Sequence, residues 1–177
     1  VALGKYLELS QSGNTVTFYN TTMDEYTEYW EKYFDLGRNY REILSAYDDE
    51  NLITACKAYP GIRILKQDEW EAVCSFIISA NNNIPRIKGI IERLSKNYGR
   101  KIIWNNKTYY TFPTEKEFLK ITANQLKDYG VGYRDKYMIN STKMILEKDD
   151  FHKNIQESSY EEAFKNIMEL EGVGPKV

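Results

Sequence analysis

Two glycines, a proline and a lysine near the end of the 177-residue chain are the residues best suited to chemistry. Gly172-Val173-Gly174 follows a helical pattern, and Pro175-Lys176 is typical of the start of a new helix. This is the helix-hairpin-helix pattern, in which glycines allow the hairpin amides and a helix N-terminus to approach a phosphate. A plain glycine-containing turn between two helices would use the same residues, so the hairpin alone leaves that alternative open.

Lys176 adds a second kind of chemistry. A lysine in the first turn of a helix lies at the positive end of the helix dipole, which disfavours its ammonium form. A lowered amine pKa would let the neutral lysine act as a nucleophile. The alternative from the local sequence is a lysine that only binds phosphate.

The charge of the chain, −2 overall, is unevenly distributed. Residues 24–50 hold nine acids against three basic residues, which gives −6, whereas residues 84–101 hold six basic residues against Glu92, which gives +5. A basic stripe on an acidic protein would restrict a polyanion to one face. The alternative is a solvated helix face.

The elements that would position these residues are mostly helical. A β-hairpin is expected from Lys5–Ser10 and Thr15–Asn20 around Ser12-Gly13-Asn14. Everything after it has helical periodicity, with helices expected at 24–35, 40–47, 50–58, 70–80, 85–98, 114–119, 123–129, 135–147 and 158–169. Aromatic residues of 24–35 form a core stripe, and 70–80 is expected to be the central buried helix. Asp68 with Glu71, and Ser158 with Glu161, are capping-box pairs.

Composition excludes several classes of protein. With 42% hydrophobic and 28% charged residues the chain is neither disordered nor fibrous, and no apolar run reaches the ~18 residues of a membrane span. No signal peptide is recognised at the start, and Cys56 and Cys74 are expected in the core rather than in a disulfide or zinc site. His152, the sole histidine, is expected to be exposed. We expect a soluble intracellular protein and, because the chain lacks an initial Met and stops just after Pro175, a segment of a longer one.

Five separated segments share a recognisable order. They are residues 61–68 (GIRILKQD), 75–87 (SFIISANNNIPRI), 130–137 (GVGYRDKY), 157–163 (ESSYEEA) and 172–177 (GVGPKV). In this order they resemble the 8-oxoguanine DNA glycosylase family of the helix-hairpin-helix glycosylases. The Asn-Asn-Asn-Ile-x-Arg-Ile and Gly-x-Gly-Tyr-Arg blocks are specific to that family, whereas the hairpin is shared with the wider superfamily. Residues 1–60 match more loosely.

The resemblance implies a role for each matching residue. Lys176 would be the Schiff-base nucleophile, and Asn81 would fill the gap left when the target nucleotide is flipped out. Tyr133 would be a wedge beside the orphan base, to which Arg86 and Arg134 would donate if it is cytosine. The backbone of the DNA would be anchored by Gly172, Val173 and Gly174. Each residue alone also has a structural alternative: a polar helix terminus, a surface aromatic or an arginine in a salt bridge.

We therefore predict a mostly helical chain, α+β overall, with the helix-hairpin-helix glycosylase fold and the remnant of an N-terminal antiparallel β-sheet domain, truncated at both ends. The expected domains are a partial sheet-plus-helix domain at 1–60, a helical glycosylase domain at 61–171, and the hairpin with the start of a second helical domain at 172–177. The family's catalytic Asp and most of its lesion pocket are expected outside the chain.

The predicted function is a bifunctional DNA glycosylase and AP lyase that removes 8-oxoguanine from duplex DNA, preferentially opposite cytosine. The alternatives are a helix-hairpin-helix glycosylase for another damaged base and a non-catalytic DNA-binding module. No cofactor or protein-bound metal is expected, apart from a cation that could bridge the hairpin to a DNA phosphate. We expect a monomer that does not bind membranes and lies with the DNA, in the cytoplasm and nucleoid of a bacterium or the nucleus of a eukaryote.

Overall fold

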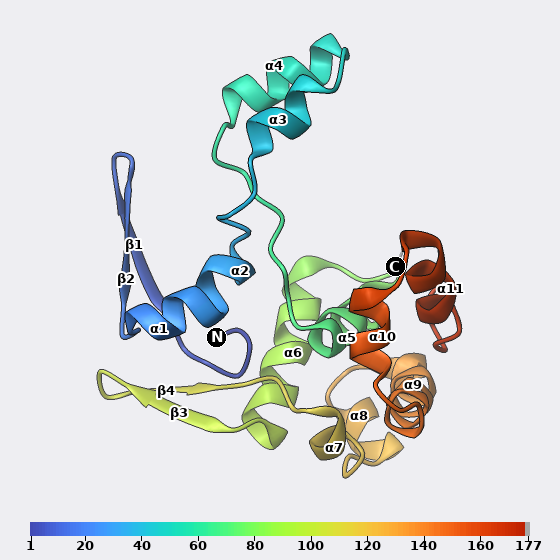
Figure 1. The fold of residues 1–177 in the computed structure, drawn as a ribbon. Helices are drawn as coiled ribbons and strands as arrows, with labels where there is room; N and C mark the ends of the chain where they lie inside the picture. The colour runs from blue at the N-terminus through green and yellow to red at the C-terminus, as the bar shows by residue number, and fades with distance from the viewer. Residues whose placement is uncertain (176–177) are drawn as a thin grey trace. The chain divides into compact units, whose positions relative to one another are not determined.

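The computed structural model describes residues 1–175. The chain divides into two compact units, one of Leu7–Gln67 and one of Val1–Tyr6 with the chain from Asp68 onward (Figure 1). Helices dominate, and two small antiparallel sheets accompany them, so the predicted α+β class is confirmed. The domain boundaries predicted at residues 60 and 171 remain predictions, because compactness alone does not define a domain.

An antiparallel hairpin begins the Leu7–Gln67 unit. Its strands are β1 (Glu8–Ser12) and β2 (Thr15–Tyr19), and Ser12 pairs with Thr15 across the turn. Gly13 has a φ of +58°, the left-handed conformation that a two-residue hairpin turn requires. The predicted hairpin is confirmed, although its first strand begins at Glu8 rather than Lys5.

One helical run follows, made of α1 (Met23–Glu25), the π-helical segment η1 (Tyr26–Trp30) and α2 (Glu31–Tyr33). The aromatic stripe predicted there packs against the hairpin, since the Phe18 ring meets Tyr26 and Phe34 edge to face at centroid distances of 5.2 and 5.7 Å. Trp30 is buried. The helices α3 (Tyr40–Ser45) and α4 (Glu50–Ala58) complete this unit and bury none of their own residues.

The other unit contains the longer helices. In chain order its elements are α5 (Glu69–Ser79), α6 (Ile84–Tyr98), β3 (Lys101–Trp104), β4 (Lys107–Tyr110), α7 (Glu115–Phe118), α8 (Ala123–Asp128), the 3₁₀ turn η2 (Gly132–Arg134), α9 (Asp135–Glu147), α10 (Phe151–Glu157) and α11 (Tyr160–Met168). Among residues 1–175, no helix combines the length and apolar character needed to cross a membrane.

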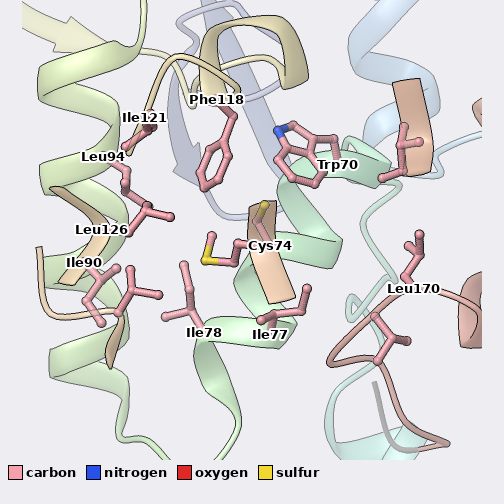
Figure 2. Close-up of a cluster of buried hydrophobic side chains, with 14 of the residues drawn as sticks. Trp70, Cys74, Ile77, Ile78, Ile90, Leu94, Phe118, Ile121, Leu126 and Leu170 are labelled. Atoms are coloured by element: carbon pink, nitrogen blue, oxygen red, sulfur yellow. The ribbon is translucent and has the colours of Figure 1, made fainter. Parts of the chain in front are cut away.

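Helix α5 supplies the centre of the core, as predicted. Its buried residues are Trp70, Cys74, Ile77 and Ile78. The Trp70 ring packs edge to face on Phe118 at a centroid distance of 5.4 Å, and its indole N–H donates to the Pro113 carbonyl at 3.1 Å. Figure 2 shows Trp70, Cys74, Ile77 and Ile78 in one cluster with Ile90 and Leu94 of α6. Since α5 and α6 pack in the same core, both ends of the loop between them are held in place.

Two expectations for the middle of the chain were wrong. Residues 101–110 form a second β-hairpin, β3 with β4, where the sequence predicted only helix-forming periodicity. Asn105 and Asn106 make its turn with φ values of 46° and 60°, a conformation that asparagine tolerates better than most residues. Helix α10 was also not predicted, and its Asp150 N-cap position has a φ of 54°.

Smaller corrections concern caps and burial. The last helix, α11, is capped by Ser159 with Glu162 in a reciprocal capping box, one residue later than the predicted Ser158 and Glu161. Cys74 is buried as predicted, but Cys56 is only half-buried. Burial raises the pKa of the Cys74 thiol well above its ordinary range, so that thiol is chemically inert.

His152 lies in a polar contact between helices and is not fully exposed. Its Nε2 is 2.6 Å from Oε1 of Glu115 on α7, and its Nδ1 is 3.7 Å from Oε2 of Glu69 on α5. The hydrogen bond with Glu115 raises the pKa of His152 above 6.5, although burial opposes the rise. The same hydrogen bond lowers the pKa of Glu115 below 4.5. His152 and Glu115 therefore form an ion pair that ties α10 to α7.

This ion pair predicts a pH-dependent stability. The stabilisation from protonated His152 is complete below pH 6.5 and is lost as the pH rises through its raised pKa. The Glu115 contribution is present above pH 4.5 and is lost as the pH falls through its lowered pKa. His152→Gln should therefore lower the melting temperature most between pH 4.5 and 6.5. The loss in the free energy of unfolding should be about 1 kcal/mol or less, because the pair is partly exposed. Calorimetry that gave the same difference up to about pH 9 would contradict this account.

Candidate nucleic-acid interface

The three asparagines between α5 and α6 have different environments. Asn82 donates from its side chain to the Ile78 carbonyl at 3.0 Å, and Asn83 caps α6 by accepting from the Arg86 amide at 3.0 Å. Asn81 is exposed, has a φ of 48°, and its side chain makes no hydrogen bond within residues 1–175. Two asparagines thus fix the loop, and the exposed Asn81 side chain has no hydrogen-bond partner within residues 1–175.

A second loop, residues 130–134, presents an aromatic ring. Gly130 and Gly132 have φ values of 88° and 67°, which turn the chain sharply between α8 and α9. The side chain of Tyr133 is 59% exposed and meets the Tyr137 ring edge to face at a centroid distance of 6.2 Å. The Arg134 guanidinium lies over the Tyr133 ring at 4.4 Å, a cation–π contact that holds the ring in place.

Arg134 connects the two loops. It is only 5% exposed, and its guanidinium donates to the carbonyls of Ala80 and Asn81 in the first loop. It also donates to the Val131 carbonyl in its own loop at 3.1 Å. This bridging position was not predicted from the sequence. The predicted contact of Arg134 with an orphan base stays a prediction.

Arg86, in the first turn of α6, completes the connection. The side chain is exposed, and its Nη2 donates to the Gly130 carbonyl at 3.2 Å. Four of the residues singled out from the sequence, Asn81, Arg86, Tyr133 and Arg134, are therefore brought together in one unit by main-chain contacts. Their roles toward DNA stay predictions.

The glycine hairpin packs on α9. Gly172 has a φ of 81°, and a Cβ placed there would lie 2.9 Å from atoms of the Tyr137 side chain. Val173 is buried and donates to the Leu170 carbonyl at 3.2 Å, while the Glu171 carbonyl accepts from Ser141 Oγ at 3.0 Å. Tyr137 thus contacts both the hairpin and the Tyr133 ring. Lys176, the predicted nucleophile, lies outside the described residues.

Comparison with known proteins identifies the family. Residues 1–73 match the model of the 8-oxoguanine DNA glycosylase N-terminal domain. A solved apo structure of the 8-oxoguanine glycosylase/lyase of Clostridium acetobutylicum is 36% identical, with a TM-score of 0.93 over 99% of this chain and 62% of that one. In sequence and in fold the chain is similar to the 8-oxoguanine DNA glycosylase family.

Two more relatives agree with this family. The C. acetobutylicum enzyme in complex with duplex DNA containing cytosine opposite 8-oxoguanine is 34% identical, with a TM-score of 0.92 over 99% of this chain and 61% of that one. The N-glycosylase/DNA lyase of Saccharomyces cerevisiae is 34% identical over 164 residues, 82% of this chain and 42% of that protein. The chain thus spans about half the length of the curated relatives it matches.

Sequence reasoning missed two residues that position these loops. Tyr137, on α9 three residues after the Gly-x-Gly-Tyr-Arg block, bridges Tyr133 and Gly172. Arg93 donates to the Tyr129 carbonyl and so holds the turn before Gly130. The signal for Arg93 was present in the basic stripe, since it lies two helical turns after Arg86 on the same side of α6. Within residues 1–175, no cluster of three or more His, Cys, Asp or Glu side chains could hold a metal ion.

The two hairpin glycines make a matched pair for a stability test. Gly172→Ala should destabilise the full-length protein by about 1–3 kcal/mol, because its φ of 81° is unfavourable for alanine and the new Cβ meets Tyr137. Gly174→Ala should change stability by less than about 0.5 kcal/mol, because no atom of residues 1–175 lies within 4 Å of its Cβ position. Urea unfolding measures both, and equal losses in the two variants would contradict this geometry.

Proposed function

We propose that the protein containing this chain excises 8-oxoguanine from duplex DNA and then cuts the strand by β-elimination. The observation that carries the proposal is that three segments contact one another within one compact unit. They are the loop between α5 and α6 that contains Asn81 (the Asn81 loop), residues 130–134 (the Tyr133 loop) and the glycine hairpin at residues 172–174. The names of the relatives support it, because they are N-glycosylase/DNA lyases and 8-oxoguanine glycosylase/lyases.

Excision requires the target nucleotide to leave the base stack, which costs a few kcal/mol. In the proposed complex Asn81 enters the gap, where its amide can both donate and accept hydrogen bonds. The exposed ring of Tyr133 wedges beside the orphan base and offsets the lost stacking. Arg86, with Arg134, donates to N3 and O2 of an orphan cytosine. The partner is therefore duplex DNA with 8-oxoguanine opposite cytosine.

The chemistry is assigned to Lys176. Its neutral amine attacks C1′ of the flipped nucleotide, and the bond from C1′ to the base breaks as the base leaves with the electron pair and takes up a proton. Loss of a proton from nitrogen and opening of the sugar ring give a Schiff base. The Schiff base acidifies the proton on C2′, so its removal expels the 3′ phosphate and cuts the strand. A non-catalytic hairpin module would need only the hairpin amides and not this lysine.

The hairpin would hold the DNA backbone near this reaction. Main-chain groups of Gly172, Val173 and Gly174 would face a phosphate, and a cation could bridge their carbonyl oxygens to it. The Glu171 carboxylate, just before the hairpin, accepts two hydrogen bonds from the Asn140 amide of α9, at 2.9 and 3.0 Å, which hold this end of the hairpin against that helix. We place the protein with the DNA, in a nucleoid or a nucleus, acting as a monomer.

Covalent trapping tests the nucleophile. Borohydride should reduce the imine between Lys176 and deoxyribose and link the full-length protein to DNA that carries 8-oxoguanine. Lys176→Gln should bind the same duplex with an affinity within about tenfold of wild type and give no adduct, because the amide cannot form an imine. Denaturing gels measure the adduct, and trapping of Lys176→Gln at the wild-type rate would contradict the assignment.

A second experiment tests the wedge. Tyr133→Ala should slow excision from duplex DNA by about ten- to a hundredfold, because nothing then offsets the unstacking cost. Excision of an already unpaired lesion should change much less. Tyr160→Ala, which removes a tyrosine that is 77% exposed on α11, is the matched control and should leave both rates unchanged. Equal losses on the two substrates for Tyr133→Ala would mean that this ring is only structural.

A further inference from the structure

Arg93 makes a paired contact with the turn that leads into the Tyr133 loop. Its Nε and Nη2 both donate to the Tyr129 carbonyl, at 3.1 and 2.8 Å. Tyr129 is the C-cap of α8, and the last carbonyls of a helix lack helical partners and carry the negative end of its dipole. A guanidinium is therefore well matched to this position, and its two bonds fix the carbonyl in direction as well as in place.

The next carbonyl along the chain holds Arg86. Gly130 O accepts from Arg86 Nη2 at 3.2 Å, which is the one hydrogen bond of that guanidinium within residues 1–175. Arg86 and Arg93 are two helical turns apart on α6, so they lie on the same face of the helix, and their guanidinium groups reach neighbouring carbonyls of the same turn. Gly130 has a φ of 88°, and a Cβ there would lie 3.4 Å from Arg93 Nη2. Arg93 thus fixes the Tyr129 carbonyl, and the next carbonyl along the chain, that of Gly130, accepts the hydrogen bond from Arg86.

We infer that Arg93 is a positioning residue for the choice of the opposite base: it fixes the Tyr129–Gly130 turn, and the Gly130 carbonyl then orients Arg86 toward the orphan base. This inference rests on the proposed function. It assigns different roles to two arginines of the same basic stripe: Arg86 contacts the orphan base, and Arg93 acts only by fixing the Tyr129–Gly130 turn. A residue that merely stabilised the fold would lower all rates together and leave the preference for cytosine unchanged.

Single-turnover excision by the full-length protein opposite each of the four bases tests the inference. Arg86→Met removes the donors at the base and should lower the preference for cytosine over adenine by about five- to a hundredfold. Arg93→Met should lower it in the same direction but less, by about three- to tenfold, because the base contact is weakened rather than removed. The double variant should match Arg86→Met alone, because Arg93 has no effect on the preference without Arg86.

Two further variants serve as control and conservative replacement. Arg100→Met is the control, since Arg100 follows the same helix and donates to the Gly4 carbonyl at 2.5 Å, away from the turn, and its loss should leave the preference unchanged. Arg93→Lys keeps the charge and a donor and should retain a preference between those of wild type and Arg93→Met. If Arg93→Met does not fold, Arg93→Lys provides the test in its place.

The results separate failure of this inference from failure of the proposed function. Wild-type preference in Arg93→Met, or in Arg93→Lys if that variant alone folds, would overturn the inference. Strictly multiplicative losses in the double variant would also overturn it, because they would mean that Arg93 acts independently of Arg86. If the wild-type protein excised no 8-oxoguanine opposite any base, the proposed function itself would be wrong.

Discussion

The buried guanidinium of Arg134 is the interaction on which the candidate interface depends. A charge that is 5% exposed is costly unless hydrogen bonds compensate for the lost water. The carbonyls that compensate here belong to Ala80 and Asn81, at the end of α5, and to Val131. The carbonyls of Ala80 and Asn81 would themselves lack partners at the C-terminus of α5. The two terminal nitrogens of this one side chain thus pair with the carbonyls of both loops, Asn81 and Arg134 being 53 residues apart in sequence, although the buried Nε has no partner within residues 1–175.

The same pairing of arginine with main-chain carbonyls recurs at the end of α8, where Arg86 and Arg93 hold Gly130 and Tyr129. The exposed groups Asn81 and Tyr133 are consequently positioned by the backbone before any partner binds. Preorganisation of this kind lowers the entropy that is lost on association. It also concentrates positive charge beside the two groups proposed to enter DNA, which favours a polyanion on this face although the whole chain carries −2.

Local sequence signals predicted the helices well and long-range contacts poorly. The spans 50–58 and 135–147 match α4 and α9 to the residue, because apolar spacing and the residues at their ends are local signals. β3 and β4 were missed, since four-residue strands give too little alternation to recognise, and the Asn105-Asn106 turn was not interpreted. The family motifs brought Asn81, Arg86 and Tyr133 to attention, but no local pattern shows that Arg134 binds the carbonyls of a loop before α6. The predicted nucleophile Lys176 lies outside the described residues.

Arg134 holds the Asn81 loop and the Tyr133 loop together through hydrogen bonds to main-chain carbonyls of both. Amide hydrogen exchange of the full-length protein tests it most directly, because the main-chain amides of Asn82 and Val131, one in each loop, donate to the carbonyls of Ser79 in α5 and Leu126 in α8. In Arg134→Met the amides of both segments should exchange about ten- to a hundredfold faster, as expected when charge-assisted hydrogen bonds to the carbonyls are lost, while the amides of the α9 interior keep their protection. Unchanged exchange at Asn82 and Val131 would contradict the account.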